Sequence, residues 1–392
     1  MIFDRARFAV AAAGFCAFLD LYAPQAVLPE LSLSFHISPA AAGTTVGVST
    51  LAVAMAAPFV GMLADRIGRK RTIVSAIGLL LIPTIMLVFA QGLREILIWR
   101  FVQGLLLPAV FSPVVAYVNE EWSPGKAADI MGLYIAGTAL GGFSGRFITA
   151  LLADHFGWRA GFAVLTVLTL MCGAIVWAWL PPARQGLAVA SRAPGALSSL
   201  LRHLCNPALV ATFAIGFAVL FSQVAVFTYV SFHLAQPPFS LGSSQLGMIF
   251  LVYLIGAVIS PASGFMVRRF GRRMAVTFSV GTACVGLLAT LQAGLPMIIV
   301  GLALFVMGSF TLMSAAMGFV GQAAQQAKAT AIGCYVSCYY VGGSVGAVLP
   351  GLVVWHRAGW PGCVALTIVI LLAALSLAWQ AWREEQRLYA AE

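Results

Sequence analysis

The sequence predicts an all-α integral membrane protein with twelve transmembrane helices, arranged as two parallel-repeat six-helix bundles around a central cavity. Composition, the number of apolar segments and an internal repeat carry this prediction. Of the 392 residues, 61% are hydrophobic and 9% are charged, whereas about 25% of residues are charged in ordinary soluble domains. With so few charges and a mean hydropathy of +0.98, the chain cannot cover a large soluble domain with polar surface.

Clusters of charged residues, Pro and Gly divide the chain into apolar segments, each near the length of about 20 residues that one crossing requires. We expect spans near 8–28, 43–64, 72–92, 96–118, 128–152, 160–180, 207–233, 244–266, 275–293, 296–320, 329–354 and 362–382. No signal-peptide cleavage pattern follows the N-terminus, which predicts an uncleaved first span. The stretch 183–206 contains Pro, Gly, Ser and Arg and is expected to be a cytoplasmic linker between domains at 1–182 and 207–392.

The basic residues predict the orientation of the chain. With the N-terminus inside, seventeen of the 22 Lys and Arg residues fall in cytoplasmic segments, as the positive-inside rule requires. Three lie outside (Arg94, Arg159 and Arg357), and two, Arg100 and Arg146, fall within spans. Topology therefore explains the net charge of +10 without a nucleic-acid partner. We expect a monomer in the inner cell membrane, with both termini cytoplasmic.

An internal repeat relates the two halves. An offset of 203 positions aligns Pro58, Gly61, Arg66, Gly68 and Arg69 with Pro261, Gly264, Arg269, Gly271 and Arg272. An offset of 201 positions aligns Gly132, Tyr134, Gly141, Gly142, Gly145 and His155 with Gly333, Tyr335, Gly342, Gly343, Gly346 and His356. The alternative is chance matching between Gly-rich segments, but both sets occupy equivalent points of a six-span unit. Parallel repeats of this kind occur in secondary transporters.

Several motifs resemble one family. The loop after the second span reads GMLADRIGRKR from Gly61 to Arg71, and a degenerate copy, GFMVRRFGRR, begins at Gly264. The fourth span contains LIWRFVQG from Leu97, and the first contains LDLYAPQAVLP from Leu19. These patterns resemble the major facilitator superfamily, and within it the twelve-span drug:proton antiporter branch that includes arabinose-efflux-permease-like proteins. The resemblance implies a transporter of small molecules that uses protons as its coupling ion and needs no other cofactor.

The fifth span departs from that branch. Its antiporter signature is GxxxGPxxGG, whereas residues 137–146 read GTALGGFSGR, so that Gly142 replaces the Pro and Arg146 replaces the last Gly. This departure leaves open import or facilitated diffusion as an alternative to antiport. Small residues still provide a face for close helix contact, and a packing role and a coupling role are both compatible with Gly137, Gly141, Gly142 and Gly145.

Acidic residues flank the basic loop and predict a cytoplasmic gate. Asp65 closes the second span, and Arg69 is placed to bridge to the acids that close the fourth span. The resemblance implies that Asp65 meets the N-terminus of the eleventh span, where a helix dipole favours a negative charge. The alternative is a loop that serves topology alone. The predicted gate residues are Gly61, Asp65, Arg66, Gly68, Arg69, Glu120 and Glu121.

Three charged residues are expected deep in the spans, where charges are functional by default. At 1.5 Å per residue, Asp20, Arg100 and Arg146 lie about 8–12 Å below the outer edge of the membrane core. We expect Asp20 to carry the proton and Arg100 to be its partner, since either water access or an Arg contact can switch the protonation of a buried acid. The alternatives are a fixed ion pair for Asp20 and Arg100, and outward snorkelling for Arg146.

Polar and aromatic residues in other spans are candidates for the substrate cavity. Soft and aromatic side chains can line an adaptable site, although each can instead pack between helices. The candidates are Arg146, Gln103, Gln223, Phe227, Tyr229, Phe310, Tyr335 and Tyr339.

Sequence motifs distinguish between the possible functions. Seven cysteines show no paired metal or disulfide spacing, and no metalloprotease, nucleophile-elbow or Walker motif is present. We therefore expect no catalytic residues, no metal and no enzyme activity. The favoured function is proton-coupled efflux of a small amphipathic molecule by rocker-switch alternating access, with a proton symporter or facilitator that imports a small metabolite as the alternative.

Overall fold

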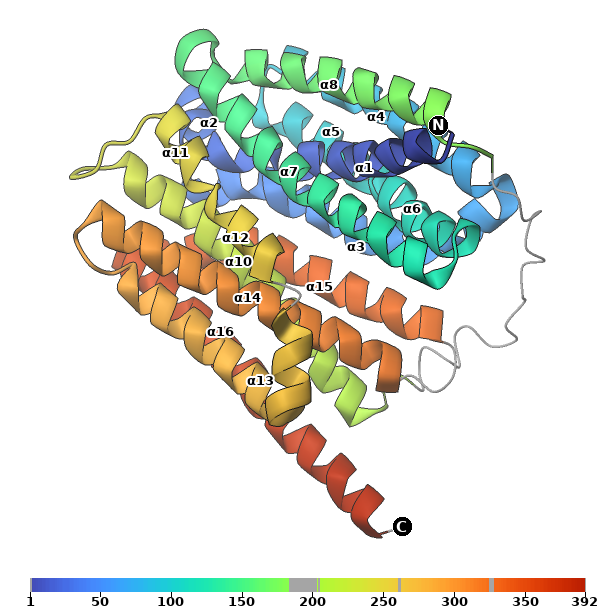
Figure 1. Cartoon of the computed structure of the whole chain (residues 1–392). Coiled ribbons are helices and arrows are strands. Elements are labelled where there is room, and N and C mark those ends of the chain that lie inside the picture. The colour runs from blue at the N-terminus through green and yellow to red at the C-terminus, as the bar shows by residue number, and fades with distance from the viewer. Residues whose placement is uncertain (1, 183–202, 204, 260–261, 324–327, 392) are drawn as a thin grey trace. The chain divides into compact units, whose positions relative to one another are not determined.

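The computed structural model describes residues 2–182, 203, 205–259, 262–323 and 328–391, and none of these forms a β-strand. The N-terminal helices are α1 (Ile2–Leu21), the 3₁₀ turn η1 (Ala23–Ala26), α2 (Leu28–Phe35), α3 (Pro39–Ile67), α4 (Arg69–Phe89), α5 (Leu93–Leu106), α6 (Pro108–Glu121), α7 (Pro124–Phe156) and α8 (Trp158–Trp179). The C-terminal helices are α10 (Pro207–Ala235), α11 (Ser243–Ile249), α12 (Val252–Ile259), α13 (Ala262–Ala289), α14 (Leu295–Ala323), α15 (Lys328–Pro350), the π-helical turn η2 (Gly351–Trp355) and α16 (His356–Ala391). The prediction of an all-α fold is confirmed (Figure 1).

Each of the twelve predicted spans falls mostly on helix where the structure describes it, with short turns inside the first, fourth and eighth predicted spans and helix ends short of the predicted limit in the third, sixth and ninth. By length and composition, eight continuous stretches among the described residues can cross a membrane, and one of them, the 52 residues Thr330–Ala381, is long enough for two crossings. The remaining predicted spans correspond to α1, to α11 with α12, and to α13. In α1 and α13 charged residues interrupt the apolar sequence, and α11 and α12 are two short pieces of one predicted span.

The chain divides into two compact units. One contains Met1–Arg192 together with Leu234–Leu254, and the other contains Ala193–His233 and Ile255–Glu392. The segment 234–254 thus belongs to the N-terminal unit, although it follows α10 in the sequence. Most of the predicted linker, 183–206, lies outside the described residues.

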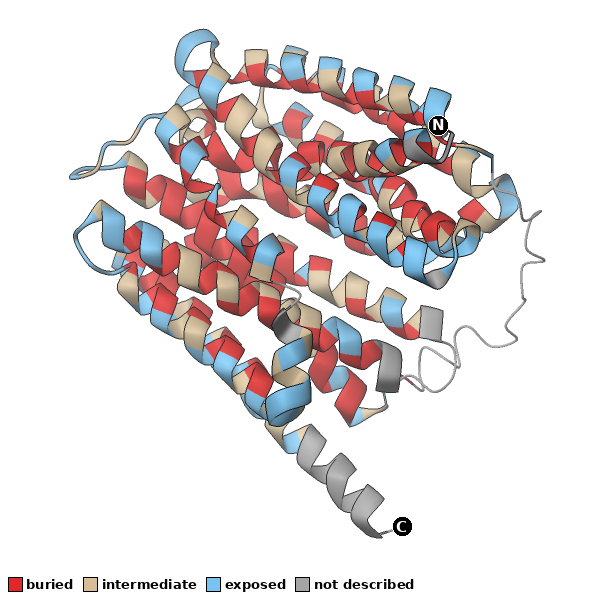
Figure 2. Ribbon diagram, viewed as in Figure 1, coloured by how far each residue is buried: buried red, intermediate tan, exposed pale blue. Residues whose placement is uncertain are grey.

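Within the N-terminal unit, α1 packs along α7 and α8, and α3 packs along α5. Within the C-terminal unit, α13 packs along α14 and α16. The helix α10 is buried along most of its length (Figure 2). Outward faces of the other helices carry exposed Leu, Ile, Val, Met and Phe residues, as expected for surfaces that face lipid.

Glycines with positive φ separate consecutive helices at equivalent places in the two halves. Gly68 (φ 99°) stands between α3 and α4, and Gly271 (φ 78°) bends α13 at the matching point. Gly157 (φ 76°) joins α7 to α8, and Gly359 (φ 55°) interrupts α16. Residues with a β-carbon rarely adopt this backbone conformation. The repeat seen in the sequence is therefore a repeat of backbone geometry.

The contact between α1 and α7 shows the same repeat in packing. A β-carbon added at Gly141 would collide with the backbone carbonyl of Phe15, because the two helices touch there without side chains between them. In the other half, Gly342 of α15 lies in the same way against the carbonyl of Phe217 on α10. On α7, contacts of this kind recur at Gly137 and Gly145, one helical turn to either side.

We predict that G141A destabilises the protein by about 1–3 kcal/mol, the usual range for overpacking. The control is G132A on the same helix, where an added β-carbon meets no atom within 4 Å. There the better helix propensity of Ala should be neutral or stabilise by up to about 1 kcal/mol. SDS-induced unfolding in mixed micelles measures both, and equal stability of the two variants would contradict the close contact.

Candidate functional site

The side chain of Arg100 satisfies the broken end of α1. Because α1 stops at Leu21, its last carbonyls have no N–H donor within the helix. Arg100 is fully buried on α5, and its Nη1 donates to the carbonyl of Asp20 at 2.7 Å, while its Nη2 donates to the carbonyl of Leu21. Nη2 also donates to Ser49 Oγ at 2.6 Å, and Nε donates to the Thr45 carbonyl at 3.1 Å. One guanidinium thus joins α1, α3 and α5.

The carboxylate of Asp20 is hydrogen-bonded by hydroxyl groups, while the charge of Arg100 acts on it from nearby. Its residue is 1% exposed. Thr169 of α8 donates to Oδ2 at 3.0 Å, and Thr84 of α4 lies 3.3 Å from Oδ1. The buried thiols of Cys16 and Cys172 lie near this group. The carboxylate therefore has hydroxyl partners on α4 and α8.

A hydrogen-bonded chain connects this carboxylate to Arg100. Arg100 Nη1 donates to Gln103 Oε1 at 2.7 Å, and Gln103 Nε2 donates to Thr84 Oγ1 at 2.9 Å. The Thr84 hydroxyl also lies 2.8 Å from the Leu80 carbonyl, so its single hydrogen is directed either to that carbonyl or to Asp20. If Asp20 is protonated, it can donate to Thr84 in return. The arrangement accommodates both protonation states of Asp20.

We expected the side chains of Asp20 and Arg100 to pair, whereas the Arg100 side chain contacts the backbone of Asp20. Arg100 reaches Asp20 through the backbone carbonyl, because the carbonyls at the end of α1 require donors. Four further residues at this site were not predicted from the sequence, and all are fully buried: Thr45, Ser49, Thr84 and Thr169. Their only signal was a hydroxyl within an apolar span, which many packing residues share.

Arg146 forms a second, separate cluster. It is 3% exposed; its Nε donates to Gln25 Oε1 at 2.9 Å and its Nη1 to the Gly142 carbonyl at 2.6 Å. Three aromatic rings lie within 5.0 Å of its guanidinium carbon, those of Tyr22, Phe250 and Tyr253. Cation–π contacts of this kind hold a desolvated cation. Arg146 therefore neither snorkels outward nor shares hydrogen-bond partners with Arg100.

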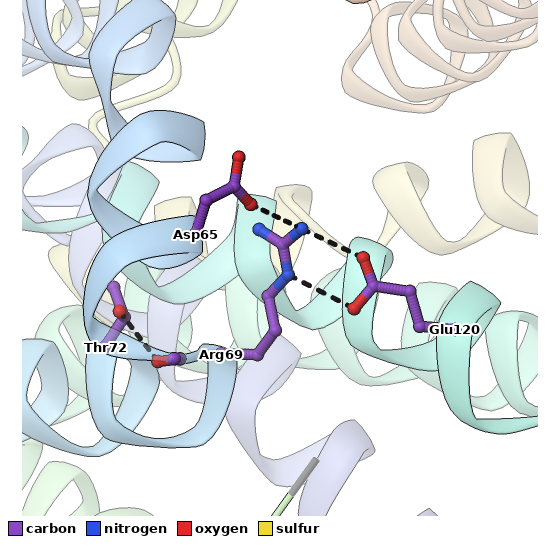
Figure 3. Close-up of polar contacts among 5 residues, drawn as sticks. Asp65, Arg69, Thr72 and Glu120 are labelled. Atoms are coloured by element: carbon purple, nitrogen blue, oxygen red, sulfur yellow. Dashed lines mark hydrogen bonds and ion pairs between the residues drawn. The ribbon is translucent and has the colours of Figure 1, made fainter. Parts of the chain in front are cut away.

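The predicted gate contains an ion-pair network (Figure 3). Arg69 Nη2 lies 2.9 Å from Glu120 Oε1, and Nε donates to Oε2 at 3.3 Å, which makes the pair bidentate. The same Nη2 lies 2.7 Å from Asp65 Oδ1, one turn earlier. Burial opposes the charge of Arg69, but Glu120 and Asp65 outweigh it and raise the pKa of Arg69.

The other predicted gate residues surround this network. Gly68 ends α3, and its carbonyl accepts from the Thr72 hydroxyl at 3.0 Å. Gly61 and Arg66 are exposed on α3. Among the described residues, Arg69 pairs with Glu120 rather than with Glu121. The N-terminus of the eleventh span, which the resemblance places near Asp65, corresponds to the start of α15 and belongs to the other compact unit.

The candidate cavity residues of the C-terminal unit fall into two groups. Tyr335 stacks on Tyr339 with ring centroids 6.2 Å apart, and the Tyr339 hydroxyl donates to Met313 Sδ at 3.3 Å. Tyr229, in contrast, donates to the Ala347 carbonyl at 3.0 Å. Positions 335 and 347 are about 18 Å apart along α15 at 1.5 Å per residue. The two groups therefore lie at different levels along α15.

Three further candidates have distinct surroundings. Gln223 is 4% exposed, and its Nε2 has no hydrogen-bond partner among the described residues. The Tyr335 hydroxyl likewise has no partner in the described part of the chain. Phe227 packs near Phe305 of α14, with centroids 6.3 Å apart, and Phe310 faces Gly256 of α12. Buried polar atoms without partners are rare in proteins, and they make Gln223 and Tyr335 the stronger candidates for contact with a polar ligand.

Comparison with known proteins identifies the family. The model of the Major Facilitator Superfamily matches residues 10–242 and 235–389. The chain belongs to the major facilitator superfamily. Its relatives and its fold are those of membrane transporters and not of enzymes, and transporters of this superfamily typically work without a cofactor. No group of three or more His, Cys, Asp or Glu residues able to hold a metal occurs among the described residues.

Relatives match over nearly the whole chain. It is 34% identical to an uncharacterized MFS-type transporter, YybF, of Bacillus subtilis (strain 168), with coverage of 96% of this chain and 93% of the relative. It is 35% identical to the inner membrane transport protein YnfM of Escherichia coli (strain K12), with coverage of 95% and 89%. These matches make the protein a multi-pass membrane transporter of the superfamily.

Solved structures show the same fold at low sequence identity. A bacterial homologue of the human lysosomal transporter Spinster superposes with a TM-score of 0.78 at 15% identity, covering 96% of both chains. The human organic anion transporter MFSD10 superposes with a TM-score of 0.71 at 18% identity, covering 96% of this chain and 99% of that one. The predicted superfamily fold, with its two repeated domains, is confirmed.

We predict that R100K lowers the stability of this transporter markedly, because Lys keeps the charge but not the planar fork of donors. Leaving two or more buried acceptors unsatisfied should reduce the free energy of unfolding by about 2–6 kcal/mol, at about 1–3 kcal/mol for each. The matched control is R66K at an exposed position, where the change should be within about 0.5 kcal/mol. SDS-induced unfolding measures both, and an R100K variant as stable as R66K would refute the capping role.

Proposed function

We propose that this transporter exports a small amphipathic molecule in exchange for protons, by rocker-switch alternating access. It acts as a monomer in the inner cell membrane with both termini in the cytoplasm; the seventeen basic residues assigned to one side support this orientation. Its domains are 1–182 and 207–392, joined by the linker 183–206.

The surroundings of the Asp20 carboxylate are the observation that supports proton coupling. A charge in a membrane interior is expensive unless it is compensated, and the side-chain partners of Asp20 are the hydroxyls of Thr84 and Thr169. Arg100 donates to the backbone carbonyls of Asp20 and Leu21, so that its charge acts on the carboxylate without a hydrogen bond to it among the described residues. Asp20 can accordingly gain and lose a proton, with Thr84, Gln103 and Arg100 as positioning residues.

The network of Asp65, Arg69 and Glu120 fits the role of a cytoplasmic gate. Single exposed ion pairs contribute only about 0–1 kcal/mol. A bidentate pair joined by a third charge is stronger than a single exposed pair. Forming or breaking it can change the populations of two conformations that differ by a few kcal/mol. We propose that this network favours one conformation of the transporter and is opened and closed during the cycle.

Import by symport, or facilitated diffusion, is the alternative. It is favoured by the fifth-span motif, where Arg146 stands in place of the final Gly of the antiporter signature and is held by Gln25 and three aromatic rings. A side chain enclosed in this way changes the surroundings of the motif, so that the span need not operate as it does in antiporters.

The test uses proteoliposomes loaded with the cationic dye ethidium or the anionic dye carboxyfluorescein, with and without an imposed pH gradient. We expect gradient-driven flux of at least one dye in the wild type and its loss in D20N, which keeps the shape but cannot release a proton. Exchange of dye without a gradient should persist in D20N. The control is D129N, an exposed acid on α7, which should match the wild type.

Full gradient-driven flux in D20N would exclude Asp20 as the proton carrier. Wild-type flux that is unaffected when the gradient is collapsed would favour the facilitator. If neither dye moves in the wild type, export of amphipathic molecules is contradicted.

A further inference from the structure

Acidic residues are distributed unevenly along the chain. From residue 155 to residue 383 the sequence contains no Asp and no Glu. Four arginines of the degenerate loop copy fall within this stretch, and we call them the arginine cluster: Arg268, Arg269, Arg272 and Arg273. They lie between the predicted eighth and ninth spans, so that we expect them at a membrane surface. No carboxylate from this long stretch of the chain is available to neutralise them.

The N-terminal copy of the loop shows how one of these arginines is paired. There the Nε–Nη2 edge of Arg69 donates to both oxygens of Glu120, and Nη2 also contacts Asp65. The offset of 203 positions that relates the two copies places Arg268 at the position of Asp65 and Ala323 at that of Glu120. The C-terminal copy thus keeps the cations of the network without its two acids.

Arg273 carries the same guanidinium edge without a carboxylate. Its Nε and Nη2 are buried, and neither has a hydrogen-bond partner among the described residues. Two such donors on one edge form the fork that binds a carboxylate or a phosphate through parallel hydrogen bonds. Buried polar atoms are nearly always paired. The unpaired fork of a permanent cation therefore indicates an anionic acceptor from outside the described residues.

Aromatic rings on two neighbouring helices position the cluster. The guanidinium carbon of Arg272 lies 3.5 Å from the ring centre of Phe319 on α14, and that of Arg273 lies 5.7 Å from the ring centre of Trp379 on α16. The Trp379 Nε1 donates to Thr277 Oγ1 at 2.9 Å, one turn along α13 from Arg273. A cation–π contact uses the charge of a guanidinium but not its N–H groups. The contact with Trp379 therefore leaves the Nε–Nη2 fork of Arg273 to another partner.

The surroundings of Arg273 suit a ligand that comes from the membrane surface. Gly271 breaks α13 two residues before it, and the apolar side chains of Phe270 and Met274 on either side are 52% and 43% exposed. Arg273 itself is only partly buried, and side chains near a surface change rotamer within nanoseconds. Rotation of the side chain can thus turn the fork outward, beside apolar surface on which acyl chains can pack.

We propose that the arginine cluster binds a phosphate group and that the Nε–Nη2 fork of Arg273 makes the bidentate contact. Arg is the side chain best matched to phosphate in this geometry. An anionic phospholipid is one source of the phosphate, because basic pockets between transmembrane helices bind such headgroups. Soluble phosphate is the other. The inference goes beyond the proposed function and depends neither on the direction of transport nor on proton coupling.

Native mass spectrometry of the purified full-length protein tests the site, with phosphatidylglycerol and inorganic phosphate titrated separately. We expect the wild type to bind at least one of them and R273Q to bind it about 10–100-fold more weakly, the usual effect of losing a charge-assisted hydrogen bond. The control is R71Q, which removes the same charge at an exposed position of the N-terminal loop copy and should bind within about twofold of wild type.

The variant R273K separates the fork from the charge. It keeps the cation but not the planar pair of donors, so that its affinity should fall between those of wild type and R273Q. Because it is conservative, it also decides the question if R273Q does not fold. Binding by R273K as tight as that of wild type, or equal losses in R273Q and R71Q, would overturn the bidentate site in favour of attraction by net charge.

The two ligands distinguish the sources of the phosphate. Binding of phosphatidylglycerol but not of inorganic phosphate supports a lipid site, and the reverse supports a site for soluble phosphate. If the wild type binds neither, the inference is overturned. The double variant E384Q/E385Q then identifies the reason: binding by this variant alone would show that acids of the chain itself occupy the fork.

Discussion

Three helices of the N-terminal unit are joined at the end of α1. The helix stops at Leu21 within an apolar layer, where a carbonyl without a donor is costly because no bulk water is available. Arg100 supplies donors to the carbonyls of Asp20 and Leu21 and also binds α3 through Thr45 and Ser49. A guanidinium suits this task because it is planar, always charged and carries five donors. The cation that we expected to neutralise an acid instead completes a helix.

This use of Arg100 determines the state of its neighbour. The carboxylate of Asp20 has hydroxyl partners on α4 and α8, and the charge of Arg100 acts on it from nearby. Arg146 is enclosed with Gln25 and aromatic rings. Arg100 and Arg146 thus have different surroundings, and we propose proton exchange for Asp20 alone.

The sequence predicted what depends on local pattern. Spans, the repeat and the small-residue face of α7 follow from residue spacing, and the structure has the Gly141 and Gly342 contacts at equivalent places. Contacts that depend on helix rotation and on where a helix breaks were not predictable. Pro24 signals that α1 ends near Leu21, but residue spacing does not show which side chain satisfies the freed carbonyls, so Arg100 was assigned to the carboxylate and Thr84 and Thr169 were overlooked. The hydrogen bond that Asp154 accepts from the backbone of Ser243 joins residues from different halves of the repeat and left no trace in sequence spacing.

The central claim is that Asp20 exchanges a proton because Arg100 is committed to the backbone. Infrared difference spectroscopy of the membrane-embedded protein over a pH titration measures it most directly, through the carbonyl stretch of a protonated carboxyl group. Our account predicts a titrating carboxyl band in the wild type that is absent in D20N and present in D129N. A band that persists in D20N, or a wild type in which no buried carboxyl titrates, would contradict it.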